Sequence, residues 1–126
     1  MGDATLETVE LPSLTAHELT RAFYSKAFGW SFDNPAPDRS TAAAGSSTLI
    51  LNGSPEDFLS APLPVIRVDD LQTALSKIAD AGGVLAKPIF AHPNGRRFHF
   101  IDPSGNELAV AEITSKQPAE ERTTTR

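Results

Sequence analysis

The residues of this chain whose side chains could perform acid–base chemistry are few, and most lie near its C-terminal end. His99 occupies an alternating segment that places it on one strand face with Arg97. Glu107 and Glu112 follow in the next alternating run, and Glu10 lies in the first. Because imidazole titrates near neutral pH, His99 beside one of these carboxylates would suit general acid–base catalysis. The alternative is a sheet histidine that hydrogen-bonds to a neighbour or to water.

The element that must position His99 is a hairpin over residues 97–112. Two alternating, largely apolar runs flank the sequence Asp-Pro-Ser-Gly-Asn at 102–106, which is typical of strand, tight turn and strand. Asp102 can accept hydrogen bonds from the backbone amides that follow it, and Gly105 can adopt the left-handed conformation that closes a turn. The segment therefore predicts a hairpin with a defined register.

The register of this hairpin decides which side chains share a face. Residues two apart on a strand point the same way, so Phe98 and Phe100 are predicted to form core packed on a helix. His99 points to the opposite face, where Ala109 and Ala111 of the second strand also point. A histidine among small residues could form the wall of a cavity. The alternative is that the alanines only relieve crowding.

Two further segments complete a recognisable pattern with this hairpin. Residues 21–30, Arg-Ala-Phe-Tyr-Ser-Lys-Ala-Phe-Gly-Trp, suit a helix and its exit, and residues 68–71 with 81–83 suit the start and end of a second helix. Together the three segments resemble the vicinal oxygen chelate superfamily, which includes glyoxalase I, bleomycin-resistance proteins and extradiol dioxygenases. The resemblance covers roughly residues 5–113. It implies an α+β fold in which two βαβββ modules form a cupped mixed sheet.

The chain's 126 residues suit one compact domain. We predict a single glyoxalase-like domain over residues 1–113, with module one at about 5–53 and module two at about 63–113. The remaining residues, 114–126, are polar and lack hydrophobic periodicity, so they are predicted to be a disordered tail.

In module one, the Thr15-Ala-His-Glu18 sequence has the spacing of a capping box, and Gly29 is positioned to end the helix that follows. The proline-rich residues 34–38 are predicted to be a loop. The predicted strands cover residues 6–11, 30–33, 41–45 and 47–52.

In module two, Asp69 or Asp70 is predicted to cap a helix that ends at Gly82-Gly83. A loop is predicted from Lys87 to Gly95, because prolines interrupt this stretch. The predicted strands before the closing run cover residues 63–68, 84–86 and 96–101.

Composition excludes several classes of function. The chain has no cysteine, so disulfides and thiolate metal sites are excluded, and a net charge of -5 argues against nucleic acid as a partner. No apolar run approaches the length needed to span a membrane, and the first residues lack the features of a secretory signal. A cytoplasmic location, with no membrane partner, is the resulting expectation.

The resemblance implies that catalytic members hold a divalent ion with His, Gln or Glu on the first and last strands of the modules. The positions carried over to this chain are Thr8 or Val9, Thr48 or Ile50, Leu63 and Ala109. None of these residue types is a usual ligand. The other histidines do not restore the set, since His17 is predicted on the exposed side of the first helix and His92 in a loop. We therefore predict no metal and no cofactor.

The family register projects Arg67 into the cup, where a guanidinium would favour a carboxylate or phosphate. The alternative is a solvated edge arginine, and Arg97 is the less favoured of the two cations. Trp30 could wall the mouth of the pocket or could be simple core. The predicted ligand-binding residues are Thr8, Glu10, Trp30, Arg67, His99, Ala109 and Ala111.

The leading hypothesis is a metal-free protein that binds a small molecule, with sequestration of a ligand or antibiotic as one form. The resemblance also implies a homodimer. An enzyme is the alternative, either a metal-dependent lyase, isomerase or dioxygenase, or a metal-free one that uses His99 as general base near Glu10 or Glu112. A third class is a partner-binding module whose cup is filled by side chains. No catalytic residue is assigned.

Overall fold

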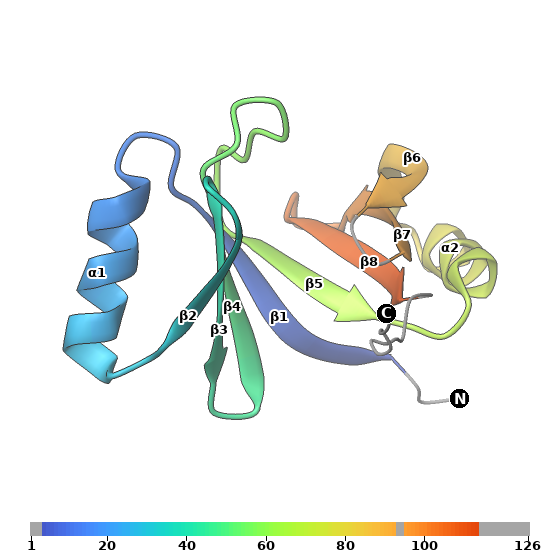
Figure 1. Ribbon diagram of the computed structural model, residues 1–126. Coiled ribbons are helices and arrows are strands. Elements are labelled where there is room, and N and C mark those ends of the chain that lie inside the picture. Colours follow the sequence, from blue (N-terminus) through green and yellow to red (C-terminus); the bar gives the residue numbers. More distant parts are fainter. Residues whose placement is uncertain (1–3, 93–94, 114–126) are drawn as a thin grey trace. The chain divides into compact units, whose positions relative to one another are not determined.

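The computed structural model describes residues 4–92 and 95–113 (Figure 1). These residues divide into two compact units, one of which is Glu7–Pro64, while the other contains residues 4–6, 65–92 and 95–113. Each half follows the same order of one strand, one helix and three strands. The predicted tail at 114–126 lies outside the described residues.

The first module has its parallel pair at one end of the strand order. The order is β2-β3-β4-β1, in which β1 is parallel to β4 and the other neighbours are antiparallel. Its elements are β1 (Thr5–Pro12), α1 (His17–Phe28), β2 (Phe32–Ala36), β3 (Arg39–Ala44) and β4 (Ser47–Asn52).

The second module repeats this plan in the order β5-β8-β7-β6, with β5 parallel to β8. Its elements are β5 (Leu63–Arg67), α2 (Leu71–Asp80), β6 (Val84–His92), β7 (Gly95–Ile101) and β8 (Glu107–Ile113). The predicted α+β class, with two βαβββ modules and mixed strand directions, is confirmed. No helix among the described residues is long and apolar enough to cross a membrane.

The apolar core of the second module lies where α2 packs on its sheet. Four residues form its buried centre, namely Val68, Leu71, Phe98 and Val110. Phe100 and Ile78 are among the partly buried residues that pack against them. The prediction that Phe98 and Phe100 face a helix is confirmed. Burial of such side chains supplies most of the free energy that holds a helix on a sheet.

The turn that closes this hairpin has the predicted chemistry. Asp102 Oδ1 accepts hydrogen bonds from the backbone amides of Ser104 and Asn106, each at 2.9 Å. The side-chain amide of Asn106 donates to Asp102 Oδ2, and these hydrogen bonds lower the pKa of the Asp102 carboxyl. Gly105 has φ of 90°, a conformation that glycine adopts without steric cost.

Two predicted loops are wrong because strands continue through proline. β2 runs through Pro35, and β6 runs through Pro88 to His92. Both strands end the order of their module, where a missing backbone donor costs little. The ladder shifts register between Lys87 and Phe90, and similarly in β2. These irregularities hide the alternation from which a strand is predicted.

The start of α1 also differs from the prediction. The helix begins after Ala16, no side chain caps it, and Glu18 pairs with Arg21 rather than with Thr15. The predicted end is confirmed, because Gly29 adopts the left-handed conformation with φ of 76°.

The start of α2 follows one of the two predicted alternatives. Asp70 is the N-cap residue, and its side chain accepts hydrogen bonds from the backbone amides of Gln72 and Thr73 at 3.0 and 3.2 Å. These bonds satisfy amides that have no partner within the helix.

Candidate functional site

Most of the side chains that could bind a ligand or take part in a reaction lie on one face of the second module's sheet. Directly paired residues in a ladder point to the same side, so the strand pairing defines this face. We call this surface the His99 face. It consists of two adjacent rows, Val65, Ala109, His99 and Lys87 in one and Arg67, Ala111, Arg97 and Phe90 in the other.

Four of the predicted ligand-binding residues therefore share one surface, namely Arg67, His99, Ala109 and Ala111. Arg97, which the sequence favoured less than Arg67, is buried next to His99 on this face. Lys87 and Phe90 were not among the predicted site residues, because Lys87 was predicted to lie in a loop. A signal was present in the β-compatible residues that follow Pro88, had the proline been allowed in an end strand.

His99 is held by a carboxylate through one ring nitrogen only. Its Nδ1 lies 2.7 Å from Glu107 Oε2, and the residue is 3% exposed. A carboxylate only accepts hydrogen bonds, so Nδ1 carries the proton and Nε2 of the neutral ring presents a lone pair. Nε2 is buried and has no hydrogen-bond partner among the described residues. Such an atom costs free energy unless something donates to it.

The electrostatics of the His99 face keep this imidazole neutral at pH 7. Burial lowers the pKa of His99 below its ordinary value of about 6.5, and the nearby charges of Arg97 and Lys87 lower it further. Glu107 acts in the opposite direction through its hydrogen bond and its charge, but burial dominates. The ring is thus available as an acceptor or as a base.

An aromatic ring borders His99. The ring centroid of Phe90 lies 5.7 Å from that of His99, and the Lys87 amino group lies 5.7 Å from the same Phe90 centroid. Arg67, at the end of β5, is exposed. The face therefore combines cations, one neutral acceptor, an aromatic ring and small apolar residues.

The other predicted carboxylates are engaged elsewhere. Glu112 Oε1 accepts from the backbone amide of Leu71 at 3.1 Å and lies 3.6 Å from Arg96 Nη2. Glu10, 1% exposed, lies 3.3 Å from Arg39 Nη2 within the first module. Of the alternatives left open by the sequence, the structure pairs His99 with Glu107.

The remaining predicted site residues lie in the first module. Thr8 pairs with Thr48 and Glu10 with Ile50, so both point to one face of that sheet. Trp30 does not lie on this face. Its ring stacks on those of Tyr24 and Phe28, with centroids 5.9 and 5.1 Å away.

The residues present do not fit the divalent ion that the family resemblance implies. Leu63 and Ala109 occupy two of the expected ligand positions, and both are buried apolar residues. Within residues 4–92 and 95–113, no three His, Cys, Asp or Glu side chains are grouped as metal ligands. Methyl groups cannot replace the oxygen or nitrogen donors that such an ion requires.

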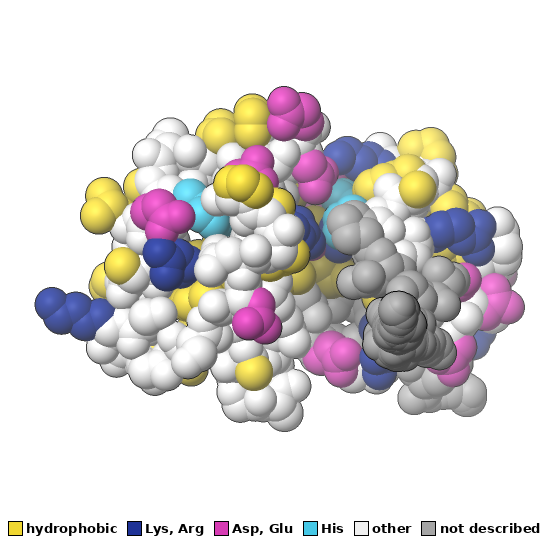
Figure 2. All heavy atoms as spheres, viewed as in Figure 1, with side chains coloured by type: hydrophobic (Ala, Val, Ile, Leu, Met, Phe, Trp, Pro, Cys, Tyr) yellow, Lys and Arg dark blue, Asp and Glu magenta, His cyan; other side chains and the backbone are white. Residues whose placement is uncertain are grey.

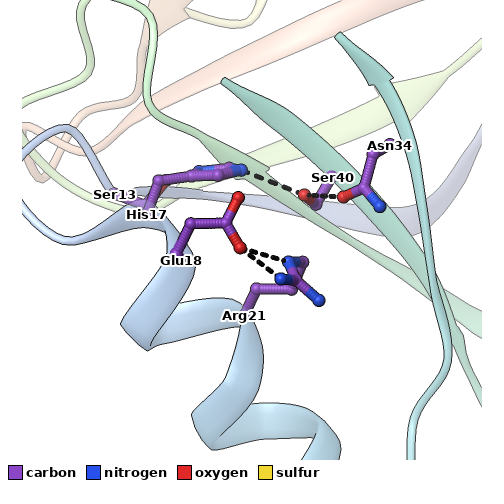
Figure 3. A network of polar contacts seen from close by, with 6 residues as sticks. All are labelled: Ser13, His17, Glu18, Arg21, Asn34 and Ser40. Atoms are coloured by element: carbon purple, nitrogen blue, oxygen red, sulfur yellow. Dashed lines mark hydrogen bonds and ion pairs between the residues drawn. The ribbon is translucent and has the colours of Figure 1, made fainter. Parts of the chain in front are cut away.

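A polar network joins α1 to the first module's sheet, which corrects the prediction that His17 is exposed (Figure 3). His17 Nδ1 lies 2.7 Å from Ser13 Oγ, and Nε2 lies 3.0 Å from Ser40 Oγ. Ser40 Oγ in turn donates to Asn34 Oδ1 at 2.5 Å. A Cβ atom at Gly53 would stand 3.1 Å from His17 Nδ1, so the network is closely packed.

The outer surface of α1 is unusually apolar. The helix has no buried residue, and hydrophobic side chains alternate with charged ones on the surface over it (Figure 2). Leu19 is 77% exposed, and Phe23 and Phe28 are similarly exposed. Hydrogen bonds of the polar network therefore link α1 to the strands.

Comparison with known proteins agrees with this architecture. Residues 16–110 match the model of the Glyoxalase/Bleomycin resistance protein/Dioxygenase superfamily. The match covers most of the sequence and both modules, so the protein is a member of that superfamily. The predicted resemblance is confirmed.

Two curated relatives are each named "Putative glyoxylase CFP32", from Mycobacterium bovis and Mycobacterium tuberculosis. Both are 30% identical in an alignment of 111 residues. The alignment covers 76% of this chain and 41% of theirs. The chain therefore spans less than half the length of these relatives.

Solved structures share the fold at low sequence identity. A structure described as an NAD-dependent benzaldehyde dehydrogenase from Legionella pneumophila has a TM-score of 0.71 at 13% identity, over 85% of this chain and 98% of that one. A glyoxalase/bleomycin resistance protein/dioxygenase superfamily member from Vibrio splendidus has 0.67 at 17%, over 86% and 99%. Methylmalonyl-CoA epimerase from Mycobacterium tuberculosis has 0.66 at 16%, over 88% and 89%.

Proposed function

We propose that this protein binds a small organic anion on the His99 face without the help of a metal ion. The observation that carries the proposal is the buried Nε2 of His99, which has no hydrogen-bond partner in the described part of the chain. A buried polar atom left in this state is expected where a ligand completes the hydrogen bonding.

The charges of the face favour an anion. Arg67, Lys87 and Arg97 are on the same face as His99. A guanidinium offers paired donors whose geometry matches a carboxylate. Ala109 and Ala111 present only methyl groups on this face, and Ala109 stands where the metal-dependent relatives would carry a glutamate on the closing strand.

Replacing Arg67 tests this proposal. Arg67→Ala should weaken the binding of mandelate, whose hydroxyl can donate to Nε2, by roughly tenfold or more, the effect of losing a charge-assisted hydrogen bond. Isothermal titration calorimetry measures the affinity, and the melting temperature should change little because Arg67 is exposed. Lys77→Ala, which removes an exposed cation from α2, is the matched control. Equal affinity in both variants would remove Arg67 from the site.

Catalysis without a metal is the second candidate, and the His99–Glu107 pair favours it. A neutral imidazole held by a carboxylate is the usual arrangement of a general base, and the lowered pKa of His99 keeps it unprotonated. A lyase or isomerase reaction that continues in the presence of EDTA, and is lost in His99→Gln, would support an enzyme. Stoichiometric binding without turnover would support sequestration of a ligand or antibiotic.

Homodimerisation and a cytoplasmic location remain proposals that rest on the family and on sequence composition. Native mass spectrometry of freshly purified protein tests the first, because it reports subunit number, bound metal and retained ligand together. A monomer at micromolar concentration would contradict dimerisation.

A further inference from the structure

We infer that the ligand of the His99 face carries a hydrogen-bond donor next to its anionic group, as a hydroxycarboxylate does. This inference rests on the proposed function and narrows its ligand class. It distinguishes a hydroxy acid from the corresponding simple acid or oxo acid, which have the same charge.

The hydrogen bond between His99 and Glu107 can run in one direction only. Glu107 Oε2 can only accept, and it lies 2.7 Å from Nδ1. The single proton of the neutral ring is therefore on Nδ1. Nε2 must accept, so a carbonyl or carboxylate oxygen placed there would meet a lone pair and be repelled.

His99 Nε2 has no hydrogen-bond donor among the described residues. In its row, His99 is paired directly with Ala109 and Lys87, and Ala109 has no polar side-chain atom. Arg97 and Lys87 are close enough to lower the pKa of His99, but neither hydrogen-bonds to Nε2. The donor must then come from a bound molecule. A hydroxyl group satisfies it, while the cations hold the carboxylate of the same molecule.

Phe90 offers an apolar contact for the rest of the ligand. Phe90 is half-buried, and its ring lies 5.7 Å from that of His99. An aryl group can pack against Phe90 in an offset or edge-to-face manner. Aryl 2-hydroxy acids are therefore suitable probes, since they carry a ring, a hydroxyl and a carboxylate.

The experiment compares mandelate with phenylacetate, which lacks the hydroxyl, and with benzoylformate, which has a carbonyl in its place. Affinities are measured by calorimetry at pH 7.5, where His99 is neutral. Mandelate should bind at least about tenfold more tightly than either analogue, because each analogue leaves the buried acceptor without a donor. Phenylacetate binding as tightly as mandelate would overturn the inference, since water alone would then satisfy Nε2.

Two variants assign the preference to this atom. His99→Leu removes the acceptor and should bring mandelate and phenylacetate to equal affinity. Glu107→Gln can donate to Nδ1, which allows the ring proton to move to Nε2, so the preference should shift towards benzoylformate. Glu56→Gln, an exposed carboxylate elsewhere, is the matched control and should keep the original order.

The outcomes separate this inference from the proposed function. Binding of all three acids with equal affinity supports the anion site and overturns the hydroxyl requirement. Failure of all three to bind overturns both. An unchanged preference for mandelate in folded Glu107→Gln and His99→Leu proteins, checked by circular dichroism, would also overturn the inference because the selectivity would arise elsewhere.

Discussion

In both modules the helix packs on the sheet at equivalent positions, which we call the helix–sheet joint. The joint is apolar in one module and polar in the other. In each, the residue that follows the first strand donates its backbone amide to the last strand, Ser13 to Asn52 and Val68 to Ala111, both at 2.9 Å. The helix starts a few residues later and meets the third strand. These hydrogen bonds define equivalent positions in the two modules.

In the second module, the equivalent positions are apolar. Val68 precedes α2, and Leu71 is its first residue. Both belong to the same buried cluster as Phe98, whose partner in the strand ladder is Val110. All four are buried. This joint is stabilised by removal of hydrocarbon from water, which does not depend strongly on direction.

In the first module, the same joint is polar. Ser13 precedes α1, His17 begins it, and Ser40 occupies the β3 position that corresponds to Phe98. Because Asn34 Oδ1 can only accept, Ser40 donates to it and accepts from His17 Nε2, and His17 Nδ1 accepts from Ser13. Each donor of this hydrogen-bond network has one acceptor, so the network orients α1.

The difference teaches that one backbone plan can be held either by burial or by directed hydrogen bonds. The apolar joint contributes more free energy, whereas the polar joint contributes orientation at a smaller net gain. α1 has no buried residue, while α2 buries Leu71. We therefore expect the second module to contribute more to the stability of the protein.

The largest predicted effect is at the apolar joint. Phe98→Ala should lower the free energy of unfolding by roughly 3–5 kcal/mol, because it leaves a cavity beneath α2. Urea unfolding followed by circular dichroism measures the change. Phe58→Ala, at a 57% exposed phenylalanine, is the control and should be nearly neutral. Similar losses in the two variants would contradict the assignment of Phe98 to the core.

A smaller effect is predicted at the polar joint. Ser40→Ala should lower the free energy of unfolding by about 1–3 kcal/mol, because it leaves the His17 Nε2–H group without its acceptor in a packed interior. The same urea experiment applies. A loss as large as that of Phe98→Ala would mean that the two joints do not differ as described.

A triple variant sharpens this comparison. Replacing three of its members at once, with Ser13→Ala, His17→Leu and Ser40→Ala, should recover stability relative to Ser40→Ala alone. The one remaining member, Asn34, is exposed, so water can replace the hydrogen bond that it loses. Losses that add up across the three positions would show that the residues contribute independently, and would contradict the coupled network.

The smallest effect is a dependence of stability on pH that belongs to the second module. The pKa of His99 is lower in the folded protein than the ordinary value of about 6.5, so the unfolded chain binds more protons between these two values. The contribution of the neutral ring is complete above pH 6.5 and is lost as the pH falls through the lower, folded value.

The slope in this window should not exceed roughly 1.4 kcal/mol per pH unit for one proton. Urea unfolding at pH 7.5 and at intervals below 6.5 measures it, and His99→Leu should flatten the profile. Phe58→Ala should retain the slope of the unaltered protein. A stability that rises as the pH falls in this window would have the wrong sign for a buried neutral histidine.

Short-range chemistry in the sequence was sufficient to predict several features. The Asp102 turn, the left-handed Gly29 and the cap at Asp70 each depend on residues within a few positions of one another. Alternation along the hairpin likewise separated Phe98 from His99, because a strand reverses its side chains at every residue. The sequence by itself therefore determined the fold class and the face on which His99 lies.

Only the tertiary structure decided which groups meet. His17 and Ser40 are 23 positions apart, and their contact depends on how α1 crosses the sheet. Glu107 was one of three candidate carboxylates for His99, and the register of β7 against β8 selected it. The physical reason is that propensity and alternation act along the chain, whereas hydrogen bonds and burial depend on distances between segments that the local sequence does not specify.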